Sequence, residues 1–239
     1  MTETLNNDFI KKLYNKYLNE IKIIRNNMQK NYYYGRPAYD DIEAEITSLF
    51  ILHFKPKHII EFSPSTGWST SIMLNALELN NNSSVLSSYD IEDRGCKPFI
   101  DSLNYKNVKW NFTLGDVTNE YSKWDLNNID YLFIDSDHSE KFAHNYINNL
   151  LIPLLNNCKQ NKKHIIVGIH DIFDKKGAIK PYREGKIVLD FLKTNNIKHY
   201  NVSKALNTNY SIINNYRKEN GITKIIHKDA NPSIWFYLQ

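Results

Sequence analysis

Glycine, cysteine and long apolar runs are scarce in this chain of 239 residues, of which only 8 are glycine and 2 are cysteine. The cysteines, Cys96 and Cys158, form no C-x-x-C pair, which argues against a disulfide framework and against a cysteine zinc site. No apolar run approaches the roughly 20 residues that a membrane span requires. Residues 1–8 also lack the charged-then-apolar order of a secretion signal. We therefore expect a cytoplasmic protein that does not associate with membranes.

An excess of one charge is also missing. The chain has 30 basic and 26 acidic residues, a net charge of +4, which is too small and too scattered to indicate a nucleic-acid partner. The length is sufficient for one large core. Apolar residues recur with a helical period over about 6–30 and 39–54. We expect residues 1–54 to form helices that pack on or cap a single globular domain at 55–239.

Within 55–239, short apolar runs alternate with helical patterns. The expected strands are 58–62, 85–90, 108–113, 129–134, 164–169 and 197–202, and the expected helices are 68–79, 95–105, 139–156 and 186–194. This alternation predicts an α/β fold with a doubly wound, mostly parallel sheet. Pro153 should kink or end its helix near Ile152. The run 233–238 suits an antiparallel strand inserted between two others, and 203–229 has no clear pattern.

The loop after the first strand indicates a ligand site, because open α/β sheets bind ligands where a strand ends and a helix begins. A dinucleotide fingerprint would have three glycines there, but only Gly67 is present, and Glu61 at the strand end would repel a phosphate. A cationic ligand fits better. We expect Ser69 or Thr70 to cap the following helix. A nucleotide-binding α/β protein and a plain strand-to-helix turn both remain compatible with this loop.

The segment 61–70, EFSPSTGWST, resembles the first motif of class I S-adenosylmethionine-dependent methyltransferases, with Ser63 and Ser65 in place of the first two glycines. The cofactor carries a sulfonium and an ammonium, so a carboxylate beside it is chemically sensible. The resemblance implies a Rossmann-like sheet of seven strands in the order 3-2-1-4-5-7-6, with strand 7 antiparallel. It also implies a set of cofactor-binding residues in this motif: Glu61, Ser63, Pro64, Ser65, Thr66, Gly67, Trp68 and Ser69.

Acidic residues follow several other predicted strands. Asp90 ends the second strand, where an acid can accept both ribose hydroxyls of a nucleoside, and the family carries one there. By the same resemblance, Asp116 is expected to accept from the adenine amino group and Asp135 to contact the cofactor. Because the carboxyl ends of parallel strands meet at one edge of the sheet, these side chains should converge on one site.

The strongest resemblance lies after the fourth and fifth strands. Segment 133–139, FIDSDHS, is similar to a signature of a branch that includes many small-molecule and sugar O-methyltransferases, and 168–173, GIHDIF, is similar to its H-D pairing. Methylation of an alcohol requires that its proton be managed, either by a histidine base or by a divalent metal. We expect His138 or His170 to act as the base. The alternative is Mg²⁺ held by Asp135 and Asp171.

The segment 174–185 is too long and too polar for a tight turn, which is typical of a functional loop. Its Tyr182, Arg183 and Glu184 suit a polyhydroxylated or phosphorylated acceptor. We expect the acceptor to be a sugar, a sugar nucleotide or a glycan.

Three other functions stay open. The first is a metal-dependent methyltransferase of a phenol or another small metabolite. The second is a non-catalytic scaffold that keeps the cofactor pocket, for which the two missing glycines argue. The third, a nucleic-acid methyltransferase, would need an N-P-P-Y-like site or a basic arm, and neither is present. The sequence is compatible with a homo-oligomer.

Overall fold

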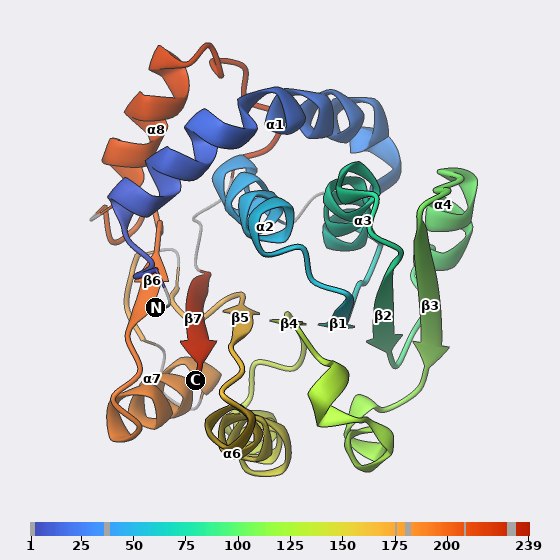
Figure 1. The fold of residues 1–239 in the computed structure, drawn as a ribbon, viewed down its shortest axis with the longest axis vertical. Helices are drawn as coiled ribbons and strands as arrows, with labels where there is room; N and C mark the ends of the chain where they lie inside the picture. The colour runs from blue at the N-terminus through green and yellow to red at the C-terminus, as the bar shows by residue number, and fades with distance from the viewer. Residues whose placement is uncertain (1–2, 36–38, 175, 180–182, 208, 229–232) are drawn as a thin grey trace.

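A seven-stranded sheet in the order β3-β2-β1-β4-β5-β7-β6 forms the centre of the computed structural model (Figure 1). The structure describes residues 3–35, 39–174, 176–179, 183–207, 209–228 and 233–239. The strands are β1 His58–Phe62, β2 Ser84–Asp90, β3 Val108–Leu114, β4 Tyr131–Ile134, β5 Ile165–Ile169, β6 His199–Asn201 and β7 Ile234–Leu238.

The strand directions confirm the predicted topology. Strands β1 to β5 run parallel to one another, whereas β7 pairs antiparallel with both β5 and β6. In this register Phe62 lies opposite Tyr89 and Ile134, so the strands β1, β2 and β4 end at the same level. The terminal run of the chain is therefore the inserted antiparallel strand that the sequence predicted.

Helices cover both faces of the sheet (Figure 1). One face carries α1, α2, α3, α4 and α8, and the other carries α5, α6 and α7. The helices are α1 Asn7–Gly35, α2 Asp41–Phe54, α3 Trp68–Asn80, α4 Cys96–Ser102, α5 Glu140–Tyr146, α6 Ile152–Asn161, α7 Glu184–Thr194 and α8 Tyr210–Glu219.

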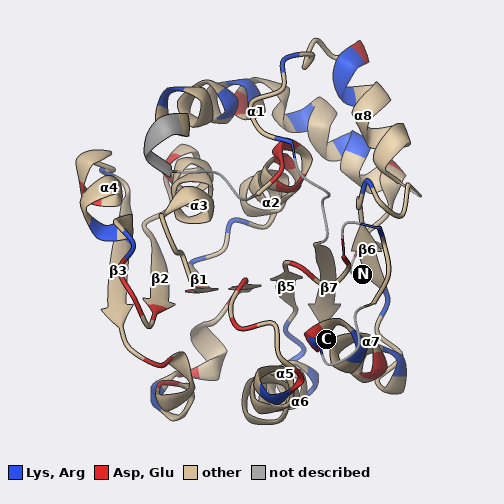
Figure 2. Ribbon diagram, turned by 180° about the vertical axis from the view of Figure 1, so that it is seen from behind, with Lys and Arg blue, Asp and Glu red and all other residues tan. Residues whose placement is uncertain are grey.

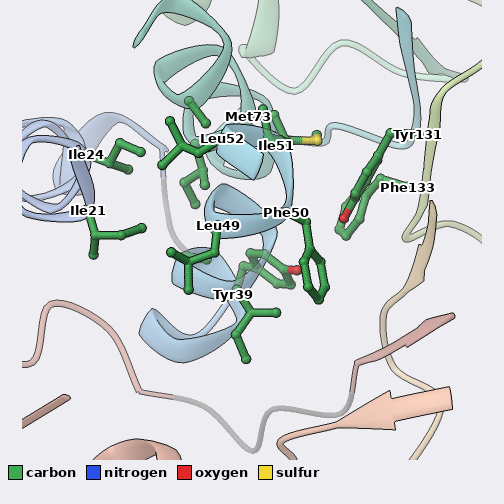
Figure 3. Packing of buried hydrophobic residues seen from close by; sticks show 14 of the residues in the cluster. Ile21, Ile24, Tyr39, Leu49, Phe50, Ile51, Leu52, Met73, Tyr131 and Phe133 are labelled. Atoms are coloured by element: carbon green, nitrogen blue, oxygen red, sulfur yellow. The ribbon is translucent and has the colours of Figure 1, made fainter. Parts of the chain in front are cut away.

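Helix α2 lies between α1 and the sheet (Figure 3). All of its residues from Asp41 to Leu52 are buried, because its apolar side chains meet the sheet on one side and α1 on the other. Its first turn is a capping box, in which Asp40 accepts from the backbone of Ile42 and Glu43 accepts from the backbone of Asp40. This turn places two further acids, Asp41 and Glu43, in the interior.

A buried network of charges joins α1, α2 and α8. Glu45 accepts a 2.6 Å hydrogen bond from the Tyr14 hydroxyl and two of 2.6 Å from Arg217. Arg25 pairs with Glu45 and, at 3.1 Å, with Asp41. Because every charge has a partner, α8 is fixed to the N-terminal helices through polar contacts in the core.

Many of the other charged residues lie on the surface, with Lys and Arg spread over the outer helices and acids on several loops that leave the sheet (Figure 2). Among the residues that the structure describes, no helix is both long and apolar enough to cross a membrane.

Three local expectations are corrected by the structure. The first helix continues through Asn31 to Gly35 instead of ending near Lys30. The N-cap of α3 is Gly67, with no side-chain cap. The helix expected at 139–156 reaches Asn161 and is interrupted by a π-helical turn over Ile147–Leu151, directly before Pro153. Pro153 has no backbone N–H to donate, so the predicted irregularity takes the form of a widened turn.

Candidate active site

A cavity of about 720 Å³ lies at the carboxyl ends of the parallel strands. Its lining comes from the loops after β1, β2, β3, β4 and β5, which meet at one edge of the sheet as the sequence predicted. The residues that line it fall into two groups according to the strands that they follow, and each group is called a half of the cavity below. One half is lined by Ser63, Ser65, Tyr89, Asp90, Ile91, Arg94, Gly115, Asp116 and Val117, and the other by Asp135, Ser136, Asp137, His138, Phe142, His170, Asp171, Ile172, Phe173, Asp174 and Arg183.

The loop between β1 and α3 has the backbone of a glycine loop without its first two glycines. Ser63 and Ser65 both adopt the left-handed conformation, with φ of 57° and 51°. Gly67 is left-handed as well, at 88°, and a Cβ there would lie only 3.0 Å from the ring of Phe99. Serine can tolerate this conformation at a cost, whereas Gly67 has neither the space nor the backbone for a side chain.

Asp90 joins this loop to the second strand. Its Oδ2 accepts from the backbone N–H of Ser65 at 3.0 Å, and its Oδ1 accepts from that of Glu92 at 3.2 Å. Asp116 also lines the cavity and accepts from the backbone of Thr118 at 2.9 Å. These bonds fix both carboxylates at strand ends while they face the same half of the cavity.

Glu61 has a different place from the one expected. It is fully buried, does not line the cavity, and accepts hydrogen bonds from the hydroxyls of Ser69, Thr70 and Ser88 at 2.6, 2.8 and 2.6 Å. Burial raises the pKa of Glu61 to about 7, although the three hydroxyls oppose the rise. Glu61 therefore holds the start of α3 against β1 and β2 from beneath the loop.

Five of the residues expected at the cofactor line the cavity, namely Ser63, Ser65, Asp90, Asp116 and Asp135. The other six do not: Glu61, Pro64, Thr66, Gly67, Trp68 and Ser69. Trp68 is buried and donates to the carbonyl of Tyr39 at 3.3 Å. The carbonyl of Pro64 accepts from the backbone of Gly67 at 2.7 Å. These residues shape the loop from within.

His138 lines the cavity in the loop after β4. Its Nδ1 hydrogen-bonds the buried carboxylate of Glu184, and its Nε2 lies 3.3 Å from Asp171 and 3.7 Å from Asp135. Burial alone would lower the pKa of His138, but the bond to Glu184 and the surrounding carboxylates outweigh it and raise the pKa. Glu184 itself does not line the cavity, so its expected contact with an acceptor is replaced by a contact with His138.

His170 is enclosed by acids. Its Nδ1 lies 3.2 Å from Asp135, and its Nε2 lies 3.5 Å from Glu43 of α2. Although burial opposes a charge on the ring, Asp135 and Glu43 raise the pKa of His170 well above its usual value. In return, His170 holds the pKa of Asp135 below its usual value, against the effect of burial. An imidazolium in this position neutralises part of the acidic cluster.

Asp135, His170 and Asp171 together form a candidate metal site. One ligand atom from each lies within 4.8 Å of the others. Asp171 has a left-handed backbone, with φ of 56°, and is about half exposed. The set contains the two carboxylates expected for Mg²⁺ and adds a nitrogen, which Mg²⁺ rarely accepts as a ligand.

The structure describes part of the segment 174–185. Arg183 lines the cavity and is exposed, whereas Tyr182 lies outside the described residues. Apolar side chains of Phe142, Ile172 and Phe173 share this half of the cavity. Among the described residues, no ion pair is formed by the guanidinium of Arg183, so it can meet an anionic or hydroxylated ligand.

Two contacts of the site could not be predicted from the sequence, that of Glu43 with His170 and that of Tyr146 with Glu184. Glu43 stands in the pattern Asp40-x-x-Glu43, which indicates a helix start, but nothing in the sequence places that start beside His170. Tyr146 donates its hydroxyl to Glu184 at 2.9 Å. Its position on the apolar stripe of a helix indicates only burial.

Comparisons with known proteins agree with this geometry. Residues 64–172 match the model of a family described as a methyltransferase domain. The O-methyltransferase from Bacillus cereus, solved in complex with SAH, is similar over 92% of this chain and 90% of its own, with a TM-score of 0.55 and 10% identity. The O-methyltransferase TomG from Streptomyces achromogenes, involved in tomaymycin synthesis and solved with SAM, is similar over 99% of this chain and 90% of its own, with a TM-score of 0.54 and 10% identity. At these identities the structural likeness establishes the fold alone. No curated protein matches this chain in sequence.

Proposed function

We propose that this protein, whose residues 64–172 match the model of a methyltransferase domain, transfers a methyl group from S-adenosylmethionine to a hydroxyl of a small polar acceptor. The observation that carries the proposal is the two-part cavity. Asp90 and Asp116 line the half formed by the loops after β1, β2 and β3, and His138, Asp135 and Asp171 line the half formed by the loops after β4 and β5. A donor and an acceptor bound in the two halves would meet at these side chains, and such alignment is the main requirement of an in-line displacement.

The residues of the first half fit the cofactor. Asp90 uses one lone pair of each oxygen on the backbone and keeps others for ribose hydroxyls. Asp116 faces the same space, beside the apolar side chains of Ile91 and Val117. When bound, S-adenosylmethionine supplies a methyl group activated by its sulfonium. The acidic lining suits the positive charges of that molecule and disfavours a dinucleotide phosphate.

His138 is the better of the two candidate bases. Both histidines line the cavity, but the side chain of His138 is 21% exposed, whereas that of His170 is 5% exposed and lies between Asp135 and Glu43, which raise its pKa. In the transfer, the O–H bond of the acceptor breaks and its proton goes to Nε2 of His138. The electron pair left on oxygen forms the new bond to carbon, and the pair of the broken C–S bond stays on sulfur. A base of this kind contributes about 10²- to 10⁴-fold to the rate.

A metal-assisted reaction is the second candidate, and the grouping of Asp135, His170 and Asp171 favours it. Bound there, a divalent cation would lower the pKa of the acceptor hydroxyl and orient it. His170 would first have to lose its proton, and Asp135 would exchange its contact with His170 for the metal. Mg²⁺ would be held chiefly by Asp135 and Asp171.

For the acceptor we favour a sugar, a sugar nucleotide or a glycan. Arg183 borders the acceptor half together with Asp137 and Asp174, which supplies planar polar groups that can pair with ring hydroxyls or with a phosphate. The apolar rings of Phe142 and Phe173 can pack against the C–H faces of a sugar, although they would also accept an aromatic ring.

Two measurements test the proposal. Calorimetry with S-adenosylmethionine and its demethylated product should detect binding, and Asp90→Ala should weaken both, while Asp101→Ala, at an exposed site on α4, should not. Absence of binding by the unmodified protein would refute the function. A transfer assay with labelled cofactor, run over sugars, sugar nucleotides, glycans and catechol-type phenols with and without a chelator, then identifies the acceptor. Methylation of phenols alone would refute the sugar assignment, and loss of turnover with the chelator would favour the metal.

A further inference from the structure

Glu184 is a buried acid that does not line the cavity, so contact with an acceptor does not explain its position. It is the first residue of α7 and only 1% exposed. One oxygen bonds Nδ1 of His138, and the other accepts from the Tyr146 hydroxyl at 2.9 Å. A buried carboxylate carries a large desolvation cost unless its lone pairs are used. Here both oxygens are used, and one partner is the candidate base.

The backbone holds Glu184 in this position. Its N–H donates to the carbonyl of His138 at 2.9 Å, and the next pair outward, Ser139 and Arg183, forms an antiparallel bridge. Gly185 lies so close to the backbone of Ile172, in the loop after β5, that a Cβ on Gly185 would be 2.2 Å from the carbonyl oxygen of Ile172. The start of α7 therefore packs against two segments, the one that carries His138 and the loop after β5 that carries Ile172.

Tyr146 holds the carboxylate from the other side. It is fully buried in the last turn of α5, directly before the π-helical turn. Since its hydroxyl occupies one carboxylate oxygen, the other is directed to His138. Helices α5 and α7, through Tyr146 and Glu184, thus fix the imidazole ring of His138.

This contact decides which nitrogen of His138 can act. An ionised carboxylate only accepts hydrogen bonds, so the Nδ1 that faces Glu184 must carry a proton. When the ring is neutral, the lone pair is then on Nε2, which lies 3.3 Å from Asp171, and a bound acceptor hydroxyl would take the place of that contact. A fixed tautomer and ring orientation are what a base needs before it meets its substrate.

We propose that Glu184 is a positioning residue, which holds the Nδ1–H of His138 so that Nε2 faces the acceptor hydroxyl. The inference rests on the proposed function, in which His138 is the base. The proposed role of Glu184 also bears on Arg183, the residue before it in the chain. Arg183 borders the acceptor half and Glu184 orients the base, so one two-residue segment, bonded to His138 and Ser139, links acceptor contact to the geometry of proton removal.

The first test needs no acceptor. In protein labelled with ¹⁵N-histidine and saturated with the demethylated cofactor, the His138 signals are assigned by their absence in His138→Ala. We expect the proton on Nδ1 in the unmodified protein, and in Glu184→Ala we expect that nitrogen to lose its protected N–H signal. A proton on Nε2 in the unmodified protein, or unchanged His138 signals in Glu184→Ala, would overturn the inference.

The second test is a double-mutant cycle with the acceptor found in the transfer screen. We expect Glu184→Ala to lower kcat by about 10²-fold, with little change in the KM of the acceptor or in cofactor affinity. In the His138→Ala background the same substitution should cost nothing further, because Glu184 acts through that ring. Tyr146→Phe, which keeps the bond to Nδ1, should lower kcat only a few-fold.

The outcomes separate the two proposals. If His138→Ala keeps near-normal kcat, His138 is not the base and the role of Glu184 fails with it. If His138→Ala is impaired while Glu184→Ala is not, or if the two effects multiply, the base is retained and the positioning role is refuted. Should Glu184→Ala fail to fold, Glu184→Gln takes its place. The amide fills the same volume but has no charge, and we expect kcat about 10-fold or more below that of the unmodified enzyme at equal cofactor affinity.

Discussion

Replacing Glu61 with Gln should remove a pH-dependent penalty from the folded state. Glu61 is fully buried under the loop between β1 and α3, and burial raises its pKa from 4.5 to about 7. In the unfolded chain the carboxyl is exposed and keeps the lower value. Between these two values the folded protein therefore binds more protons than the unfolded chain, and the free energy of unfolding must fall as the pH rises.

The size of the effect follows from the two pKa values. A difference from 4.5 to about 7, at about 1.36 kcal/mol per pKa unit, corresponds to about 3 kcal/mol. Most of it, about 2.5 kcal/mol, is lost between pH 5 and pH 8. Glutamine has nearly the same shape and can still accept from the hydroxyls of Ser69 or Thr70, but it does not ionise. The variant should therefore gain stability relative to the unmodified protein by about this amount as the pH is raised.

Urea unfolding of both proteins at the two pH values measures the change. Other groups titrate in the same range, so only the difference between the two proteins is used, and at low pH the variant can be the less stable one. Glu219→Gln, at an exposed position on α8, shows how much of the change comes from removing one negative charge alone. A difference between Glu61→Gln and the unmodified protein that is equal at both pH values would refute the reasoning, since the carboxyl would then keep one charge state in the fold.

Further predictions concern the buried network and the loop backbone. Arg217→Ala should lower the free energy of unfolding by about 3–5 kcal/mol, because it leaves buried carboxylates unpaired, whereas Lys186→Ala, which breaks an exposed pair, should cost about 0.5 kcal/mol or less. Equal losses in urea unfolding would contradict this. Ser65→Gly should change stability by no more than about 1 kcal/mol, since relief of the left-handed strain offsets the entropy of glycine, and its bond to Asp90 uses the backbone. Gly67→Ala should cost about 1 kcal/mol or more, from the same conformation and the contact with Phe99, and a thermal melt that ranks the two loop variants in the opposite order would refute this account.

The sheet could be predicted from the sequence because periodicity and strand ends are local signals. The runs Tyr131–Ile134 and Ile165–Ile169 are buried on both faces, and the acids that follow them, Asp135 and Asp171, mark the edge where the chain turns. The direction of each side chain could not be predicted in the same way. Glu61 is the last residue but one of β1 and Asp90 is the last of β2, but Glu61 lies under the loop while Asp90 lines the cavity, and that difference depends on the pleat and on three hydroxyls from other segments.

Long-range polar contacts were beyond the sequence for a related reason. Arg217 lies 172 residues from Glu45, in a segment with no clear period, and only the packing of α8 on α1 and α2 brings the two together. Tyr146 and Glu184 are likewise separated by 38 residues. Hydrogen bonds of this kind leave no periodic trace, because either partner alone has the composition of an ordinary surface or core position.

The glycine loop illustrates what a motif records. Its physical requirement is a set of left-handed backbone positions that let the chain turn sharply and keep N–H groups toward a strand-end acid. Ser63 and Ser65 meet this requirement as serines that line the cavity, with the N–H of Ser65 on Asp90, whereas a Cβ at Gly67 would lie against the ring of Phe99. By residue type, this loop has only one of the three glycines of the motif. By backbone angle, all three positions, Ser63, Ser65 and Gly67, are left-handed. The cofactor half of the cavity is therefore better identified by conformation than by residue type, and the single glycine that remains is the one for which packing leaves no alternative.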